Sequence, residues 1–352
     1  MNEVMSVERP LSREELIQVI EGKGHVGRVP LWYHVWTSPC VFGERSAEVQ
    51  KLLDEMPCDA EQVILGMPQV FDAPPQDPTY RWVQKENRYD ESQVGYDARV
   101  AIEDWEELDD VLAHFPDPNS PSLIPDVGPK GERYRIVHWW YWLFERLWSL
   151  RGMENALTDF YTDPDCIHRL FERLTDFYCR VLERSKAELD ADGLFLSDDI
   201  GTQSGPFFSI EIFREFFKPY YKRLIDCAHA LGMHVWMHSC GNIELYLPEL
   251  IEIGLDVIHP IQKHTMDEKQ IAAQFGDQIC IFAGFDVQQT IPYGTPEEVR
   301  AETRFLIDSY ARSDGRFMLT MGNGVTADCP VESLRALFEE SLTYGRQKLS
   351  KL

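Results

Sequence analysis

Eight short apolar runs alternate with longer amphipathic runs along this chain, and this alternation restricts its possible folds more than any other feature. Several of the short runs carry β-branched or aromatic residues and are bounded by Gly or Pro, as strands are. The predicted strands are Pro30–Trp36, Gln62–Leu65, Arg135–Trp139, Gly193–Ser197, His234–His238, Val257–Pro260, Cys280–Gly284 and Phe317–Met321. Strands that alternate with helices predict a parallel sheet, and therefore an α/β protein.

Two closures of such a sheet compete, a doubly wound open sheet and a (β/α)8 TIM barrel. An open sheet should carry a Gly-rich phosphate turn after its first strand, and none follows Trp36. The count of eight strands favours the barrel, and 352 residues lie within the range of one barrel with insertions. We therefore expect residues 1–352 to form a single TIM-barrel domain.

Pro- and Asp-rich stretches predict a small insertion after the second strand. Residues 67–80 and 115–129 are expected to be loops, because Pro lacks a backbone donor and favours extended geometry in the residue before it. Between these loops, residues 81–113 are expected to form a small hairpin followed by a helix. The insertion therefore covers about residues 67–130 of the barrel domain.

Local signals mark where four of the helices begin. These signals are Ser12 with Glu15, Asp163 with Pro164, Thr295 with Glu298, and Pro330 with Glu332. The Ser12 and Thr295 pairs have the spacing of a capping box, in which each side chain satisfies the backbone N–H of the other residue. Asp163 and Pro164 open a periodic run that is expected to stay helical to about Leu189.

The charge balance excludes two classes of partner. The chain has 34 basic and 59 acidic residues, a formal net charge of −25, which repels nucleic-acid phosphates and anionic membranes. No apolar run reaches the about 18 residues that span a bilayer, and Met1 to Pro10 hold no apolar stretch that would suit a signal peptide. Eight cysteines without a regular framework are typical of a reducing compartment, so we expect a cytoplasmic protein.

The segment MHVWMHSCGN carries the clearest sign of chemistry. His238 and Cys240 lie two residues apart at the end of a predicted strand, so both side chains would point to one spot at the barrel mouth. Imidazole and thiolate together are typical zinc ligands, although a core histidine and a buried cysteine would look the same. Cys329 is the candidate third ligand, because it lies near the start of the last helix, where backbone amides lower the pKa of a thiol. The alternative is that Cys329 is only a small residue before that helix.

Two adjacent carboxylates, Asp198 and Asp199, follow another buried strand. Carboxylates at such a position are costly to desolvate unless they are paired or functional. They are candidate catalytic residues that hold a metal, orient a ligand histidine or donate a proton to a leaving group. We expect one of them to cap the next helix turn, and at least one to have a functional role.

The remaining candidate residues lie where other strands end, and we expect them to bind substrate. They are Tyr33, His34, Trp36, His138, Trp139, Gln203, Asp286 and Asn323. Aromatic side chains at a barrel mouth suit a flat or aromatic substrate. The alternative is that many of the aromatic residues pack in the core and that Asp286 only caps a helix.

The chain from about Glu145 to its C-terminus resembles the uroporphyrinogen decarboxylase-like superfamily. The resemblance rests on FERLWSLRGMENALTDFYTDP, on LFLSDDIGTQSGPFFSIEIFREFFKPYYKRLIDCAHALGMHVWMHSCGNIELYLPELIEIGLDVIHPIQ, on FAGFDVQQTIPYGTPEEV and on NGVTADCPVESLRAL. This superfamily includes zinc-dependent, corrinoid-linked methyltransferases and O-demethylases. Its fold is a (β/α)8 barrel, in agreement with the strand count.

The resemblance implies a zinc site with one unusual position. The His-x-Cys pair of the methyltransferase branch corresponds to His238 and Cys240. The third ligand in that branch is a Cys that follows a Gly, and here Asn323 follows Gly322 at that place. Cys329 or an acidic residue could substitute, and a site without zinc is the remaining alternative.

The resemblance therefore implies zinc-dependent methyl transfer between a small methylated substrate or thiol and a corrinoid held by a partner protein. A decarboxylase or lyase without metal is one alternative. The Arg-rich N-terminal motif of the decarboxylase branch is missing, since no Arg lies between Val29 and Gly43. A barrel that binds a tetrapyrrole or corrinoid without turnover is the other alternative.

Overall fold

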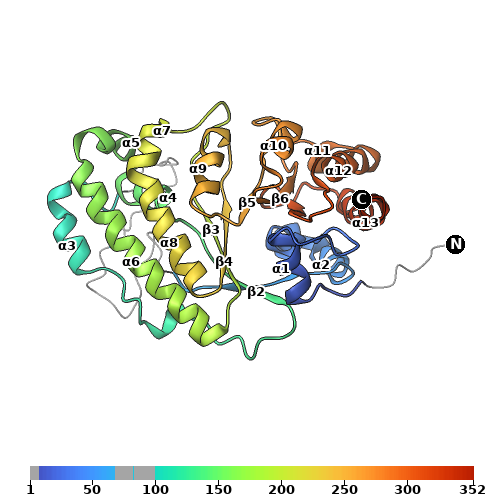
Figure 1. Ribbon diagram of the computed structural model, residues 1–352, viewed down its shortest axis with the longest axis horizontal. Helices are drawn as coiled ribbons and strands as arrows, with labels where there is room; N and C mark the ends of the chain where they lie inside the picture. Colours follow the sequence, from blue (N-terminus) through green and yellow to red (C-terminus); the bar gives the residue numbers. More distant parts are fainter. Residues whose placement is uncertain (1–7, 68–81, 83–99) are drawn as a thin grey trace.

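The computed structural model describes residues 8–67, 82 and 100–352, which contain a parallel sheet surrounded by helices (Figure 1). Seven strands are found in these residues, and each pairs with the next in the order β1 to β7. They are β1 (Ala60–Ile64), β2 (Tyr134–Trp139), β3 (Gly193–Ser197), β4 (His234–His238), β5 (Val257–His259), β6 (Cys280–Phe285) and β7 (Phe317–Met321). This curled, all-parallel sheet confirms the predicted α/β, TIM-barrel-like fold.

The helices lie mostly between consecutive strands, as the alternation predicts (Figure 1). They are α1 (Arg13–Ile20), α2 (Ser46–Asp54), α3 (Leu108–Ala113), α4 (Phe144–Arg151), α5 (Met153–Thr162), α6 (Pro164–Leu189), α7 (Ile210–Ile212), α8 (Lys218–Ala230), α9 (Leu247–Glu252), α10 (Glu268–Phe275), α11 (Thr290–Tyr293), α12 (Pro296–Tyr310) and α13 (Val331–Leu349). Both predicted capping boxes are present, at the starts of α1 and α12. The hairpin predicted between residues 81 and 100 lies almost wholly outside the described residues, whereas α3 confirms the helix that follows it.

The first predicted strand, Pro30–Trp36, is wrong as a strand. Leu31 alone forms a bridge, with Leu319 of β7, and Tyr33–Val35 is a turn of 3₁₀ helix. Pro30 has no N–H to donate to a ladder, and the N–H of Leu31 donates to the carboxylate of Asp59 instead. The barrel therefore has seven strands in its described part, with a single bridging residue in the eighth position.

This short segment still joins the two edges of the sheet. The carbonyl of Leu31 accepts from the N–H of Asp59, just before β1, while Leu319 of β7 donates to the carbonyl of Pro30. The carboxylate of Asp59 also pairs with the guanidinium of Arg28 through two contacts of 2.7 and 2.6 Å. Both side chains are buried, so Arg28 and Asp59 form an internal clamp between β7 and β1.

The interior of the barrel is filled by aromatic side chains. Trp32 packs against Phe195 of β3, Trp236 of β4 and Phe282 of β6, with ring centroids 6.0 to 6.1 Å apart. All four side chains are buried. They make a solid floor, so any ligand has to bind above them, at the carboxyl ends of the strands.

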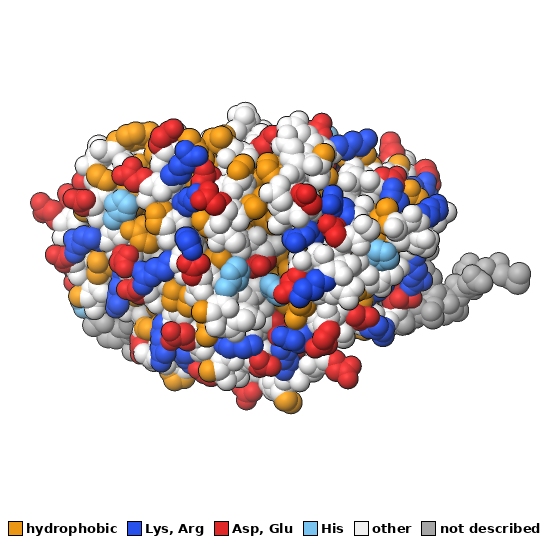
Figure 2. Space-filling model, viewed as in Figure 1, with side chains coloured by type: hydrophobic (Ala, Val, Ile, Leu, Met, Phe, Trp, Pro, Cys, Tyr) orange, Lys and Arg blue, Asp and Glu red, His pale blue; other side chains and the backbone are white. Residues whose placement is uncertain are grey.

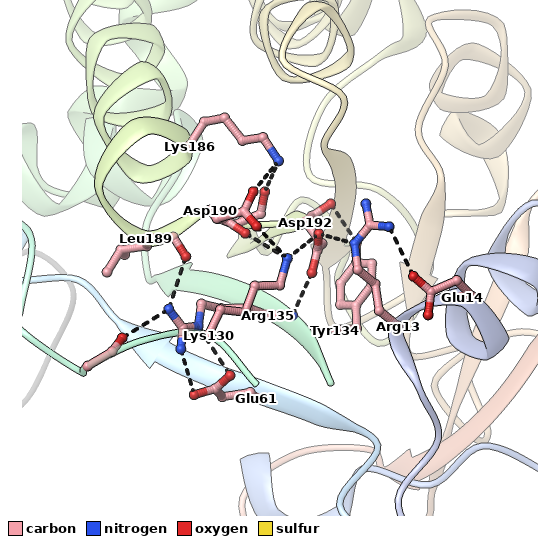
Figure 3. A network of polar contacts seen from close by, with 12 residues as sticks. Arg13, Glu14, Glu61, Lys130, Tyr134, Arg135, Lys186, Leu189, Asp190 and Asp192 are labelled. Atoms are coloured by element: carbon pink, nitrogen blue, oxygen red, sulfur yellow. Dashed lines mark hydrogen bonds and ion pairs between the residues drawn. The ribbon is translucent and has the colours of Figure 1, made fainter. Parts of the chain in front are cut away.

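A polar network lies at the other end of the barrel, at the amino ends of the first three strands (Figure 3). Asp192, just before β3, accepts from Arg13 Nε at 2.6 Å, from Lys130 Nζ at 2.7 Å and from the N–H of Arg135 at 2.9 Å. The guanidinium of Arg135 in turn binds Glu61 of β1. Polar groups at this end of a TIM barrel contribute to stability.

On the outside, Figure 2 shows acidic and basic side chains interspersed over the face in view. Ion pairs between neighbouring turns of helix, such as Lys222 with Asp226 on α8, account for part of this pattern. No helix in the described part of the chain is both long and apolar enough to cross a bilayer.

We predict that Asp59→Ala destabilises the protein by about 3–5 kcal/mol, because it leaves the guanidinium of Arg28 buried without its partner. Asp226→Ala is the control, since it breaks an ion pair whose two side chains are each more than half exposed, and we expect a loss below about 1 kcal/mol. Urea denaturation measures both. Equal losses in the two variants would contradict the role of Asp59 as an internal clamp.

Candidate functional site

Three potential metal ligands meet at the carboxyl ends of β3 and β4. Asp199, His238 and Cys240 each offer one ligand atom, and these atoms all lie within 4.8 Å of one another. Nε2 of His238 lies 3.4 Å from Sγ of Cys240 and 3.6 Å from Oδ1 of Asp199. The structure therefore brings the His-x-Cys pair together as expected and adds Asp199 to it.

A hydrogen-bonded chain fixes the free nitrogen of His238. Nδ1 of His238 lies 2.8 Å from Nδ1 of His259, and Nε2 of His259 lies 2.9 Å from the carbonyl oxygen of Met321. A carbonyl only accepts, so His259 carries its proton on Nε2 and, when neutral, accepts at Nδ1. His238 must then donate from Nδ1, which leaves its Nε2 without a proton and directed at Asp199 and Cys240.

Burial keeps these imidazoles neutral. It lowers the pKa of His238, which lies among buried aromatic rings, although the charge of Asp199 opposes this effect. It lowers the pKa of His259 further, with a contribution from His238. A neutral imidazole with a bare nitrogen is the form that binds a metal ion.

The thiol of Cys240 is neutral in the absence of a cation. Burial raises its pKa to about 12, the charge of Asp199 raises it as well, and a hydrogen bond from Asn323 lowers it. Nδ2 of Asn323 lies 3.4 Å from the sulfur, so Asn323 contacts the site. A bound divalent cation would deprotonate such a thiol.

The two adjacent carboxylates have different environments. Asp198 is fully buried and accepts four hydrogen bonds, from the N–H groups of Leu143, Phe144 and Glu145 and from the hydroxyl of Tyr221. These bonds cap the start of α4 and use both of its oxygens. Asp199 is 40% exposed at its side chain and accepts from the N–H of Cys240 at 2.7 Å. Asp199 is therefore the carboxylate that faces the site.

Trp36 and His138 are the predicted aromatic residues that lie beside the ligands. Trp36 stacks on His259 with centroids 5.1 Å apart and lies 5.0 Å from the ring of His238. Its Nε1 and the Nδ1 of His138 are buried without a hydrogen-bond partner among the described residues. Burial lowers the pKa of His138 to about 3.

Three other predicted aromatic residues face helices instead. The hydroxyl of Tyr33 binds Ser341 of α13, and Nε2 of His34 lies 3.2 Å from the carbonyl of Leu53 in α2. Trp139 stacks on Tyr178 of α6. Successive residues of a strand point to opposite sides, so Trp139 packs outward while its neighbour His138 lies inside.

An open pocket of about 380 Å³ adjoins Cys240. Its lining includes the predicted residues Asp286 and Asn323, together with Lys263 and Gln262. Gln203 lies beside it, since Oε1 of Gln203 accepts from Gln262 at 3.3 Å. Asp286 also caps α11, as its carboxylate accepts from the N–H groups that open this helix.

Cys329 is not a member of the ligand group found among the described residues. Its side chain is buried, and its carbonyl accepts from Arg45 at 3.0 Å. The expected lowering of its pKa is wrong, because burial raises the pKa of this thiol instead. Pro330, which opens the last helix after it, has no N–H with which to stabilise a thiolate.

Sequence reasoning missed His259 and Glu145. His259 is the last residue but one of the predicted strand Val257–Pro260, which follows the one ending in His238, and the parallel register pairs these two histidines. Glu145 accepts from the hydroxyl of Ser197, and burial raises its pKa well above the usual range, with the charges of Asp199 and Asp198 adding to the effect. Nothing in the local sequence distinguishes Glu145 from the other acidic residues that begin helices.

We predict that the two carboxylates differ when each is removed. Asp198→Ala leaves three buried N–H groups and a hydroxyl without an acceptor, so we expect a loss on the order of 4 kcal/mol in the free energy of unfolding. Asp199→Ala is the matched control and should cost within about 1 kcal/mol. Urea denaturation measures both losses, and the reverse order would contradict this division of roles.

Comparison with known proteins gives a family match over most of the barrel. The uroporphyrinogen decarboxylase (URO-D) family matches residues 146–344, which include all three potential metal ligands. The chain is 30% identical over 190 residues to a methylated-thiol–coenzyme M methyltransferase of Methanosarcina mazei, covering 53% of this chain and 47% of that protein.

Two further matches come from the same organism. A methylcobamide:CoM methyltransferase is 25% identical over 184 residues, with 52% of this chain and 51% of that protein covered. The matches thus span about half the length of these curated relatives. A solved methyltransferase structure superposes with a TM-score of 0.49 at 16% identity, covering 61% of this chain and 59% of that one.

Proposed function

The chain belongs to the uroporphyrinogen decarboxylase family, and on this basis we propose that it is a zinc-dependent methyltransferase or demethylase. It would move a methyl group between a small methylated substrate or thiol and a corrinoid carried by a partner protein that docks over the barrel mouth. The convergence of Asp199, His238 and Cys240 at the mouth carries this proposal. The methyltransferase relatives support it.

The three donors fit zinc by their chemistry and their spacing. An imidazole nitrogen, a thiolate and a carboxylate oxygen are all common zinc ligands, and three protein ligands leave a fourth position for a substrate. Nitrogen, oxygen and sulfur ligands of a tetrahedral zinc ion lie about 3.3–3.6 Å from a nitrogen ligand, and the measured separations from Nε2 of His238 are 3.4 Å to the sulfur and 3.6 Å to the carboxylate oxygen. Asp199 would then take the place of the third ligand, a cysteine in the methyltransferase branch.

When bound, zinc supplies a Lewis acid that holds a thiol as a thiolate or polarises a leaving group. His259 orients His238 and fixes its proton on Nδ1. Asn323 donates to the sulfur of Cys240 and so stabilises its thiolate form. Trp36 covers the two imidazole rings and excludes water from them.

The decarboxylase alternative has less support from the site. A tetrapyrrole with eight carboxylates needs several cationic partners. The arginine just before the Arg-free segment from Val29 to Gly43 is Arg28, and it is buried in an ion pair with Asp59. Among the residues that line the pocket beside Cys240, Lys263 is the basic one, and it is paired with Glu302.

We predict about one zinc ion per chain in the purified protein, measured by metal analysis with mass spectrometry. His238→Ala and Cys240→Ser should abolish zinc binding, and Asp199→Asn should weaken it. Cys329→Ser is the control and should keep the metal, because Cys329 lies outside the ligand group.

Zinc-loaded protein should then transfer methyl groups from ethers, amines or thiols to cob(I)alamin. A protein that takes up no zinc, or that transfers no methyl group, would contradict the proposal.

We predict that His259→Leu weakens zinc binding about 10–100-fold, because His238 loses the partner that fixes its tautomer and ring orientation. Competition with a chromogenic chelator measures the dissociation constant. His138→Leu is the control, since it removes an equally buried histidine outside this hydrogen-bonded chain. Equal effects of the two substitutions would show that loss of packing, not loss of the hydrogen bond, is responsible.

A further inference from the structure

The charges around the pocket beside Cys240 are unbalanced. Two charged side chains are found among its lining residues, Lys263 and Asp286. The ammonium of Lys263 is already engaged, because Nζ lies 3.0 Å from Oε1 of Glu302 and 3.8 Å from Oε1 of Glu268. Glu302 is buried, so water screens this pair poorly, and the pair offers no free positive charge to a ligand.

One carboxylate lies in the pocket wall itself. Asp286 is buried at the pocket wall and accepts from backbone N–H groups and from the hydroxyl of Thr290. Asp199, which accepts from the N–H of Cys240, does not line the pocket and is a proposed zinc ligand, so its charge is left out of this balance. Three carboxylates, that of the lining residue Asp286 and those of Glu268 and Glu302 beside Lys263, therefore stand against the single ammonium of Lys263. The neutral side chains that complete this wall, Gln262 and Asn323, do not compensate.

From this imbalance we infer that the small molecule entering the pocket has a neutral or cationic tail. An anionic tail, such as the sulfonate of the coenzyme M named for the relatives, would meet an excess of negative charge. The inference rests on the proposed function in one respect, since it takes the pocket beside Cys240 as the substrate site. The inferred substrate therefore differs in charge from the coenzyme M for which the relatives are named. Neutral or amine-bearing methyl donors and acceptors would suit the pocket.

The test uses Cys240 as a reporter of the charge in its own pocket. Metal-free protein is treated with methanethiosulfonate reagents of similar size whose tails are cationic, neutral or anionic. Mass spectrometry of the peptide that contains Cys240 gives the rate of modification by each reagent. Because the same thiolate reacts in every case, its pKa cancels from the ratio of the cationic to the anionic rate.

Cys40 supplies the internal reference, since it is exposed on the segment before α2 and experiences the overall charge of the protein. We expect the cation-to-anion rate ratio at Cys240 to exceed that at Cys40 by about ten-fold or more in low salt. An equal or lower ratio at Cys240 would overturn the inference.

Matched variants locate the source of the effect. Glu302→Gln removes a negative charge and frees Lys263, so the ratio at Cys240 should fall several-fold towards that of Cys40. Glu297→Gln is the control, because Glu297 is exposed on the same helix, α12, and does not line the pocket. A ratio that responds equally to both substitutions would overturn the inference.

The labelling experiment needs neither zinc nor methyl transfer. Failure of the proposed function would appear as absence of metal or of turnover, whatever the labelling ratio. If the protein binds zinc and transfers methyl groups, while its metal-free form gives a cation-to-anion ratio at Cys240 no higher than at Cys40, this inference alone is overturned.

Discussion

The buried ion pair between Arg28 and Asp59 joins the edges of the sheet, and the site depends on that closure. The same carboxylate accepts from the N–H of Leu31, so the segment after Arg28 is held between β7 and β1. Trp36 lies five residues further on, and this anchoring places its ring over His238 and His259. An interaction at the bottom of the barrel thus determines what covers the site at its top.

The site itself follows from parallel pairing between neighbouring strands. Ser197, His238 and His259 end β3, β4 and β5 and are paired across the sheet in register. Parallel strands end at one edge, so polar side chains distant in sequence meet there. β7 completes the arrangement through the carbonyl of Met321, which fixes the proton of His259 and so the free nitrogen of His238.

Much of the fold can be predicted from the sequence, because the alternation of apolar and amphipathic runs is a local property. The seven strands other than Pro30–Trp36 are confirmed to within a few residues, and α6 begins at Pro164 and ends at Leu189 as expected. The failure at Pro30–Trp36 has a long-range cause, since Asp59 takes the N–H that a ladder would need. The aromatic content of that segment predicts a strand whether or not Asp59 accepts this N–H, so the local sequence could not reveal the difference.

The candidate site could be predicted only in part. The spacing of His238 and Cys240 places both at one point, but spacing cannot show which of two adjacent carboxylates faces them. That choice depends on where the start of α4 lies, because its N–H groups bind Asp198 and leave Asp199 for the site. Whether Cys329 reaches the ligands is equally a matter of three-dimensional placement.

The different roles of Asp198 and Asp199 have an evolutionary consequence. One carboxylate holds the scaffold and its neighbour faces the ligand position, so mutations at the second site are not constrained by folding. Asn323 and Asp199 both contact the His238–Cys240 pair, Asn323 through the sulfur of Cys240 and Asp199 through the ring of His238. Under the proposed function, a barrel arranged in this way could exchange the residue that provides the third metal ligand while the fold stays the same.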